Sequence, residues 1–363
     1  MLLLILAAGL LAFVAAACGD SNDSSSTSAS TGGGSASLSG EIAGAGSTAQ
    51  QAAQEAWIAG FQGANSGVTI AYDPVGSGGG REQFTAGGVA FGGSDAALAD
   101  EELTAGQTRC GGPDNLVEIP DYVSPIAVIY NVSGVDSLKL SPETLANIFA
   151  QKITKWNDPA IAADNAGVDL PDTNITPVNR SDESGTTENF VDYLSQAAPD
   201  VWTYEVSGDW PVKGGEAAEG TSGVVDAVTN GDGTIGYADA SQAGSLGIAE
   251  VKVGSDFVGP TAEAAAKIFD ESAPSGDPGK NVFTFTLNRT PDASDTYPIV
   301  LVSYLMGCTT YDSAGDAALV KAYFNYIISP DGQQVASGAA GSAPLSDSVR
   351  AKIQPAVDAI GGS

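Results

Sequence analysis

The sequence contains no histidine among its 363 residues. This absence removes the usual general base near neutral pH, the Ser-His and Cys-His nucleophile pairs, and the commonest metal ligand. Catalysis would have to rely on carboxylates or lysine, and the sequence has neither a P-loop nor a Gly-x-Ser-x-Gly nucleophile elbow. We therefore expect no enzyme activity, no metal ion and no cofactor.

Basic residues are scarce as well, since 14 Lys and Arg stand against 44 Asp and Glu and the formal net charge is -30. Nucleic acids and anionic lipids are bound by clustered Lys and Arg, so this balance argues against both as partners. A small anion remains possible as a ligand, because donors inside a buried site act locally while distant surface charges are screened. The chain is long enough for two lobes, each with its own core.

A short apolar run without charges extends over residues 2–17 and is followed by Cys18. It falls short of the roughly 20 residues that a membrane-spanning helix needs, and small residues precede the cysteine as in cleaved export signals. We predict a signal peptide over residues 1–17, lipidation of Cys18, and a flexible Ser/Gly-rich linker over residues 18–40. A plain secretory signal is the alternative, because no Lys or Arg precedes the run and Ala15 stands where lipoprotein signals usually carry leucine.

Two further cysteines remain, Cys110 and Cys308. Export from the cytoplasm favours a disulfide bond between them. Two separate buried thiols are the alternative.

From residue 41 onward, strand-like and helix-like patterns alternate, which is typical of an α/β fold. Apolar spacing predicts helices over residues 50–62, 187–194 and 316–328, and strands over residues 68–72 and 175–179.

Two helix starts are expected from capping residues. Ser141 and Pro142 predict one start, with the hydroxyl as cap and proline in the first helical position. Asp95 is predicted to cap a helix over residues 96–103.

Three segments rich in glycine and hydroxyl groups stand where helices are expected to begin, at residues 44–49, 76–80 and 180–187. Helix N-termini present unpaired N–H groups and a positive dipole end, and glycine lets the backbone approach a ligand closely. Each segment alone is most simply a set of caps and turns. The three together, with one arginine, predict a shared anion site.

These segments resemble the phosphate-binding protein of the bacterial phosphate-specific ABC importer. The resemblance covers roughly residues 41–350 and is most specific in Arg180-Ser-Asp182-Glu-Ser184-Gly-Thr186. The matching pieces before it are Gly44-Ala-Gly-Ser-Thr48, Gly76-Ser77 and Phe91-Gly-Gly-Ser94-Asp95. One departure concerns Ala49, whose position is commonly aromatic in that family and often followed by proline, whereas Gln50 follows here.

The resemblance implies a ligand set that draws on hydroxyls, backbone N–H groups and one guanidinium. Its members would be Ser47, Thr48, Ala49, Ser77, Asp95, Arg180, Ser184, Gly185 and Thr186. Arg180 would supply the full positive charge and Asp182 would orient it. Asp95 would accept a hydrogen bond from the proton of phosphate, a proton that sulfate lacks. Hydroxyl groups would be donated by Thr48, Ser77, Ser184 and Thr186. Backbone N–H groups would come from Thr48, Ala49, Ser77, Ser184, Gly185 and Thr186.

The resemblance also implies a two-lobed periplasmic-binding-protein fold of the second type, with a hinge and discontinuous lobes. Residues 41–131 plus 297–363 would form one lobe and residues 132–296 the other. The expected function is binding of inorganic phosphate outside the cytoplasm and its delivery to the membrane permease and ATPase subunits of an ABC importer. The protein would be a monomer anchored by lipid to the outer face of the cell membrane. Alternatives are a binding protein for another oxyanion such as sulfate or molybdate, a phosphate-ester hydrolase, and a receptor that only reports phosphate.

Overall fold

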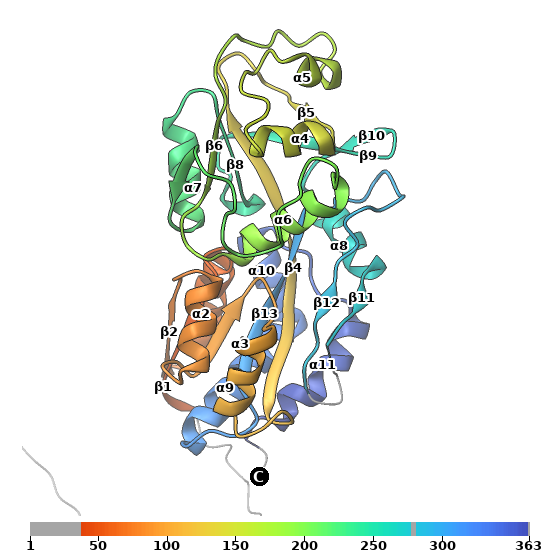
Figure 1. Ribbon diagram of the computed structural model, residues 1–363. Helices are drawn as coiled ribbons and strands as arrows, with labels where there is room; N and C mark the ends of the chain where they lie inside the picture. Colours follow the sequence, from red (N-terminus) through yellow and green to blue (C-terminus); the bar gives the residue numbers. More distant parts are fainter. Residues whose placement is uncertain (1–37, 277–280, 362–363) are drawn as a thin grey trace, which may run out of the picture. The chain divides into compact units, whose positions relative to one another are not determined.

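The computed structural model describes residues 38–276 and 281–361 of the chain. The predicted signal peptide, Cys18 and nearly all of the predicted linker lie outside the described residues. Strands and helices alternate along the described chain, as expected for an α/β fold (Figure 1).

The strands form one large mixed sheet and one separate pair. They are β1 (Ser39–Gly46), β2 (Gly67–Asp73), β3 (Phe91–Ser94), β4 (Leu116–Asn131), β5 (Lys139–Leu140), β6 (Thr176–Arg180), β7 (Glu216–Ala218), β8 (Thr234–Asp239), β9 (Gly247–Val253), β10 (Asp256–Val258), β11 (Ala273–Pro274), β12 (Phe285–Thr286) and β13 (Val300–Cys308). The order in the large sheet is β2-β1-β3-β13-β4-β8-β6-β7, with β9 pairing to β4, β5 and β10. Strands β11 and β12 pair only with each other.

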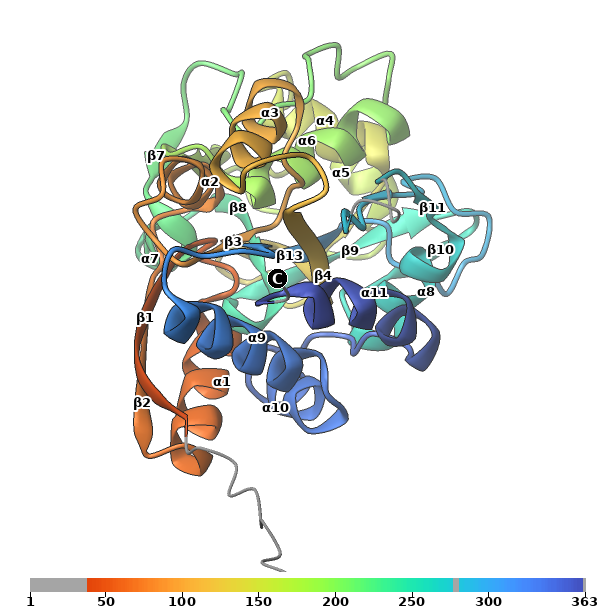
Figure 2. The same cartoon turned by 90° about the horizontal axis from the view of Figure 1, so that it is seen from below.

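Helices connect these strands. They are α1 (Gln51–Ala64), α2 (Ser77–Thr85), α3 (Asp100–Arg109), α4 (Pro142–Phe149), α5 (Pro159–Asp164), α6 (Gly185–Ala197), α7 (Gly220–Asn230), α8 (Ala262–Glu271), α9 (Ala314–Ile328), α10 (Pro330–Ala340) and α11 (Asp347–Ala359). Helices α1, α9 and α10 contact one another and lie together in Figure 2. The predicted helices at 50–62, 187–194 and 316–328 are confirmed as α1, α6 and α9, and the predicted strands as β2 and β6.

Strand β4 runs through both halves of the sheet. Its first part, from Leu116 to Pro125, pairs with β13, and its second part, from Ile126 to Asn131, pairs with β8 (Figure 1). We call the elements β1–β3, α1–α3, β13 and α9 the first lobe, because β13 pairs with β3 and α9 packs on β1, and we call the elements β6–β8, α6 and α7 the second lobe. One continuous strand thus joins the two lobes.

One predicted helix start and one predicted helix cap differ from the structure. Helix α3 begins at Asp100 after Ala99, so the prediction that Asp95 caps a helix over residues 96–103 is wrong. The Asp95 carboxylate is taken up by side-chain hydroxyls instead, as described below. Helix α4 does begin at Pro142, but the Ser141 hydroxyl lies 2.7 Å from the Thr144 hydroxyl and caps no backbone N–H.

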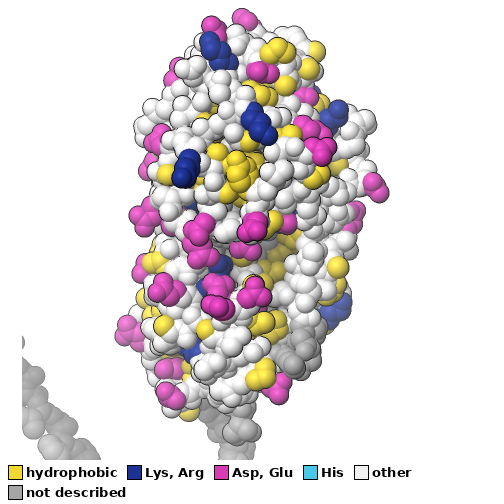
Figure 3. All heavy atoms as spheres, viewed as in Figure 1, with side chains coloured by type: hydrophobic (Ala, Val, Ile, Leu, Met, Phe, Trp, Pro, Cys, Tyr) yellow, Lys and Arg dark blue, Asp and Glu magenta, His cyan; other side chains and the backbone are white. Residues whose placement is uncertain are grey.

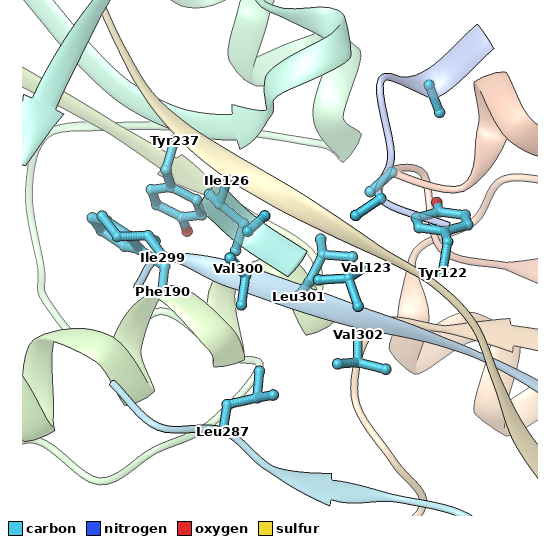
Figure 4. Close-up of a cluster of buried hydrophobic side chains, with 14 of the residues drawn as sticks. Tyr122, Val123, Ile126, Phe190, Tyr237, Leu287, Ile299, Val300, Leu301 and Val302 are labelled. Atoms are coloured by element: carbon cyan, nitrogen blue, oxygen red, sulfur yellow. The ribbon is translucent and has the colours of Figure 1, made fainter. Parts of the chain in front are cut away.

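The main core lies along the antiparallel pair of strands β4 and β13. Val123 and Ile126 of β4 and residues 299–302 before and within β13 are fully or almost fully buried (Figure 4). Beside them, Phe190 of α6 and Tyr237 of β8 stack with ring centroids 4.5 Å apart. This packing fixes α6, whose first residues belong to the predicted site.

The predicted disulfide bond is present. Cys110 at the end of α3 is bonded to Cys308 at the end of β13, across a sequence separation of 198 residues. Both cysteines are buried.

Candidate anion-binding site

The three predicted loops come together at ends of strands from both lobes. Strand β1 leads into α1 in the first lobe, and β6 leads into α6 in the second. The sheet is locally parallel at both places, since β1 pairs in parallel with β2 and β3, and β6 with β7 and β8. The carboxyl ends of parallel strands, followed by helix N-termini, are a common place for ligands in α/β folds.

Asp95, which follows β3, is the centre of the hydroxyl cluster. Its Oδ2 accepts hydrogen bonds from the Ser47 hydroxyl at 2.6 Å and the Thr186 hydroxyl at 3.2 Å. Its Oδ1 accepts a third from the Ser303 hydroxyl at 3.1 Å. The first lobe and the second lobe therefore meet at this one carboxylate.

The environment of Asp95 acts on its pKa in two directions. Burial is the largest effect and raises the pKa of Asp95 above its ordinary value. Hydrogen bonds from Ser47 and Ser303 and the positive charge of Arg180 act the other way and favour the ionised form. The Asp95 carboxylate thus depends on the hydrogen bonds that it accepts to remain ionised.

Arg180 is the last residue of β6, and two nitrogens of its guanidinium contact the two carboxylate oxygens of Asp182. The Arg180 Nε donates to Asp182 Oδ1 at 2.8 Å, and Nη2 forms an ion pair with Oδ2. The backbone N–H of Gly220 also donates to Asp182 Oδ1, at 3.0 Å. Burial raises the pKa of Asp182, but the hydrogen bonds and charge of Arg180 outweigh it and hold that pKa below its ordinary value. The predicted pairing of this arginine and this aspartate is present.

Ser77 and Gly185 face each other across the lobes. The Asp95 backbone N–H donates to the Ser77 hydroxyl at 3.1 Å. A Cβ on Gly185 would lie 2.8 Å from that hydroxyl oxygen and 2.9 Å from the Ala96 nitrogen, so only glycine fits. Ser77 is the first residue of α2 and Gly185 the first of α6, and the first backbone N–H groups of a helix have no partner within it.

Thr48 meets the second lobe at the start of α7. Its hydroxyl lies 2.8 Å from the Thr221 hydroxyl and accepts from the Thr221 backbone N–H at 3.1 Å. The Gln242 side chain donates to the Thr48 carbonyl oxygen at 3.1 Å. Thr48 therefore lies at the contact between the lobes.

Two of the backbone N–H groups assigned from the resemblance are occupied within the protein. The Ala49 N–H donates to the Ser47 hydroxyl at 3.0 Å, and the Ser184 N–H donates to the Gly208 carbonyl at 3.0 Å. The Ser184 hydroxyl accepts from the Thr187 N–H at 3.2 Å as the cap of α6, which leaves its hydrogen free to be donated.

Four polar residues of this region were not part of the prediction. They are Gln50, Asn189, Thr221 and Ser303, all of them buried. Thr221 had a signal, since it follows a glycine at a helix start like the three predicted loops. Ser303 had none, because it stands within an apolar strand sequence and reaches Asp95 only through the pairing of β13 with β3.

A pocket of about 300 Å³ adjoins the cluster on the side of α6 and β12. It is lined by Asp95 and by side chains that include Asn189, Asp192, Arg289 and Tyr304. Arg289 donates to Asp192 Oδ2 at 2.7 Å and to Asn189 Oδ1 at 2.6 Å, and Asn189 donates in turn to the Asp95 carbonyl at 2.7 Å. This network also ties α6 to the loop after β3.

Residues 38–276 and 281–361 contain no group of three or more Asp, Glu, Cys or His that could hold a metal ion. In the same residues no helix is both long and apolar enough to span a membrane.

Two lobes joined through a shared sheet, with hydroxyl, amide and guanidinium groups facing each other between them, define a substrate-binding protein of the periplasmic type. The model of the PBP superfamily domain matches residues 27–331. The chain is 36% identical to phosphate-binding protein PstS3 of Mycobacterium bovis (strain BCG / Pasteur 1173P2), over 98% of this chain and 97% of that one. It is 34% identical to phosphate-binding protein PstS of Xylella fastidiosa (strain 9a5c), over 76% of this chain and 74% of that one. The chain therefore belongs to the PstS family of substrate-binding proteins.

Solved structures agree on the fold. The phosphate-bound periplasmic protein PfluDING has a TM-score of 0.73 at 24% identity, over 87% of this chain and 93% of that one. A phosphate-binding protein from Stenotrophomonas maltophilia has a TM-score of 0.66 at 22% identity, over 87% and 94%. The expected two-lobed α/β fold is confirmed.

Proposed function

We propose that this protein binds inorganic phosphate between its lobes, outside the cytoplasm, and delivers it to the permease and ATPase subunits of an ABC importer. The observation that carries the proposal is the buried Asp95 carboxylate among hydroxyl donors, with the Arg180 guanidinium facing the same region. The names of the relatives support the same ligand.

The proposed ligand set is the one implied by the resemblance, adjusted for the amides that are already occupied. Hydroxyls of Thr48, Ser77 and Ser184 and the backbone N–H groups of Ser77, Gly185 and Thr186 would hold the phosphate oxygens, whereas the Thr186 hydroxyl donates its hydrogen to Asp95. Arg180 would neutralise their charge, with Asp182 fixing its plane. Asp95 would accept the P–OH hydrogen bond, while sulfate would place an unprotonated oxygen against the carboxylate.

The proposed mechanism is that phosphate binding favours closure of the two lobes, because both lobes contribute residues to the site. Thr48, Ser77 and Asp95 come from the first lobe, whereas Arg180, Ser184 and Thr186 come from the second. A ligand that contacts both sets gains all its contacts only when the lobes meet, so binding would favour the closed state. The lobe limits at residues 131/132 and 296/297 are part of this proposal.

Attachment to the outer face of the membrane through Cys18 and action as a monomer also belong to the proposal. The anchor is supported by sequence alone, through the apolar run and the small residues before Cys18, and the monomeric state is an expectation from the resemblance. Mass spectrometry of the membrane-associated protein would show the mass of the lipidated N-terminal peptide.

The deciding experiment is calorimetric titration of ligand-stripped protein with phosphate, and then with sulfate and molybdate. We expect tight binding of phosphate alone. Binding of sulfate or molybdate as tight as that of phosphate would mean that the protein binds oxyanions in general. Absence of phosphate binding would refute the proposal. Incubation with a chromogenic phosphate ester tests the hydrolase alternative, for which we expect no release of product.

A further inference from the structure

A line of hydrogen bonds leads from the core of the first lobe to Asp95. The Tyr323 hydroxyl donates to Gln54 Oε1 at 2.8 Å, and Gln54 Nε2 donates to Gln50 Oε1 at 3.0 Å. Gln50 Nε2 then donates to the Ser303 hydroxyl oxygen at 2.6 Å, and that hydroxyl donates to Asp95 Oδ1 at 3.1 Å. All of these side chains are buried. Every donor in the line points toward Asp95.

The direction of this line follows from the number of hydrogens available. A serine hydroxyl has one hydrogen to donate and lone pairs that accept. Because Gln50 Nε2 donates to the Ser303 oxygen, the single hydrogen of Ser303 is left for Asp95. A glutamine amide can donate only from nitrogen, so the line cannot reverse while Gln50 keeps this orientation.

The same glutamine also directs the donor on the other oxygen of Asp95. Its backbone N–H donates to the Ser47 hydroxyl oxygen at 3.3 Å, beside the Ala49 N–H at 3.0 Å. The hydrogen of Ser47 is thereby left for Asp95 Oδ2, which it reaches at 2.6 Å. Gln50 therefore sets the donors of both carboxylate oxygens, one through its main chain and one through its side chain.

Room for this glutamine is made by a glycine. A Cβ on Gly93 of β3 would lie 2.5 Å from Gln50 Oε1, so that any larger residue would displace the amide. Gln50 is also fully buried, with 0% of its surface exposed. The surroundings of position 50 therefore accommodate a side-chain amide. The family pattern often has proline here, which has neither a side-chain amide nor a backbone N–H.

We propose that Gln50 is a positioning residue that keeps Asp95 a hydrogen-bond acceptor and so maintains discrimination between protonated and unprotonated oxyanions. The proposal rests on the proposed function, and Gln50 itself acts through Ser47 and Ser303. Without these donors a buried carboxylate takes up a proton more readily. The protonated carboxyl is then a donor, and an unprotonated sulfate oxygen can accept its hydrogen bond.

Other charged and titratable groups near Asp95 are compatible with this role. The positive charge of Arg180 favours the ionised Asp95 carboxylate, and Asp95 in turn helps to raise the pKa of Asp121 in β4 and of Asp239 in β8. Burial is the largest cause in both cases, and it raises the pKa of Asp121 well above its ordinary value and that of Asp239 to about 6. Tyr72 and Tyr122 also face Asp95, and burial raises the pKa of each, so both remain neutral.

Sulfate is the probe, because it has no proton to lose between pH 5 and 9 and its pH dependence reports on the protein. Gln50→Met keeps the length of the side chain and removes its donor and acceptor. We expect sulfate binding by the variant to appear at a pH about one unit higher than in the wild type, which corresponds to about tenfold weaker discrimination at a given pH. Gln51→Met is the matched control, since the Gln51 side chain bonds only to Glu55 on the exposed side of α1; it should leave the sulfate profile unchanged.

Circular dichroism would reveal misfolding of Gln50→Met. A second pair of variants, at Ser303, keeps the proposal testable in that case. Ser303→Ala should reproduce the shift of the sulfate profile, and Ser303→Thr, which retains a hydroxyl, should restore the wild-type profile. If the wild type rejects sulfate and both Gln50→Met and Ser303→Ala keep its profile, the positioning role is refuted while the proposed function stands. If the wild type itself does not bind phosphate, the proposed function fails instead.

Discussion

At the scale of single residues, Asp95 carries the largest expected effect on specificity. Asp95→Asn preserves the shape of the side chain but replaces one acceptor oxygen by a donor NH₂ group. Sites that demand one particular hydrogen-bonding group reject its analogue by about 10⁴–10⁵. We expect phosphate-over-sulfate discrimination to fall by at least about tenfold, with the fold retained.

Calorimetric titration of both anions against this variant measures the effect. Asp73→Asn is the control, because Asp73 lies exposed on β2 and undergoes the same chemical change. Unchanged discrimination in a variant that still binds phosphate would contradict the role of Asp95.

The residues near Asp95 also show what the sequence allowed us to predict. Arg180, Asp182, Ser184 and Thr186 lie within seven consecutive positions, so a local motif was enough to place them together. Ser303 comes from a strand more than a hundred residues later and became visible only through strand pairing. Gln50 was noticed solely as a departure from a pattern, because its contacts depend on the three-dimensional position of β13.

At the scale of secondary-structure elements, the loop between β6 and α6 closes against α2 of the first lobe. Arg81 of α2 is buried and donates to Glu102 at 2.9 Å and to Ser94 at 3.0 Å. It also forms an ion pair with Glu183, which stands between Asp182 and Ser184 in the loop. Acidic side chains gather over α3 and toward α6 on this face (Figure 3). When the lobes separate, Arg81 keeps its partners in its own lobe and loses only Glu183.

Glu183→Gln is therefore expected to speed the release of phosphate without changing the choice of anion. Glu183 is 41% exposed, and ion pairs open to solvent contribute about 0.2–1 kcal/mol, so we expect the dissociation rate to rise by up to about fivefold at low salt. Stopped-flow fluorescence measures that rate, and added salt should bring the wild-type rate toward that of the variant. Glu82→Gln, an exposed change on α2, should leave the rate as it is. Equal rates for wild type and Glu183→Gln at low salt would show that the ion pair between Arg81 and Glu183 does not hold the lobes together.

The ends of the helices were predicted with unequal success. The ends of α1, α6 and α9 were predicted within a few residues because the apolar spacing of each helix is strong. The predicted start of α3 was wrong because Asp95 resembles a helix cap in sequence. In the structure, its carboxylate instead accepts hydrogen bonds from three hydroxyl groups of distant segments. Local propensity is overridden where a tertiary contact offers the same group better partners.

At the scale of the whole molecule, the disulfide bond fastens the first lobe alone. Cys110 ends α3, and Cys308 ends the part of β13 that pairs with the beginning of β4. Neither cysteine touches the second lobe, whose contacts with the first run through Thr48, Asp95 and Arg81. Stability and closure should therefore respond differently to loss of this bond.

The double variant Cys110→Ala, Cys308→Ala separates the two properties. A crosslink over a separation of 198 residues restricts the unfolded chain strongly, so its loss is expected to lower the free energy of unfolding by about 2–5 kcal/mol. The dissociation constant for phosphate should stay within about twofold of the wild type, because the anion-binding groups and the lobe contacts are intact. Denaturant unfolding and calorimetry measure the two quantities, and a reducing agent should have no effect on the double variant. A loss of phosphate affinity as large as the loss of stability would mean that the order of the first lobe, rather than closure alone, sets the affinity for the anion.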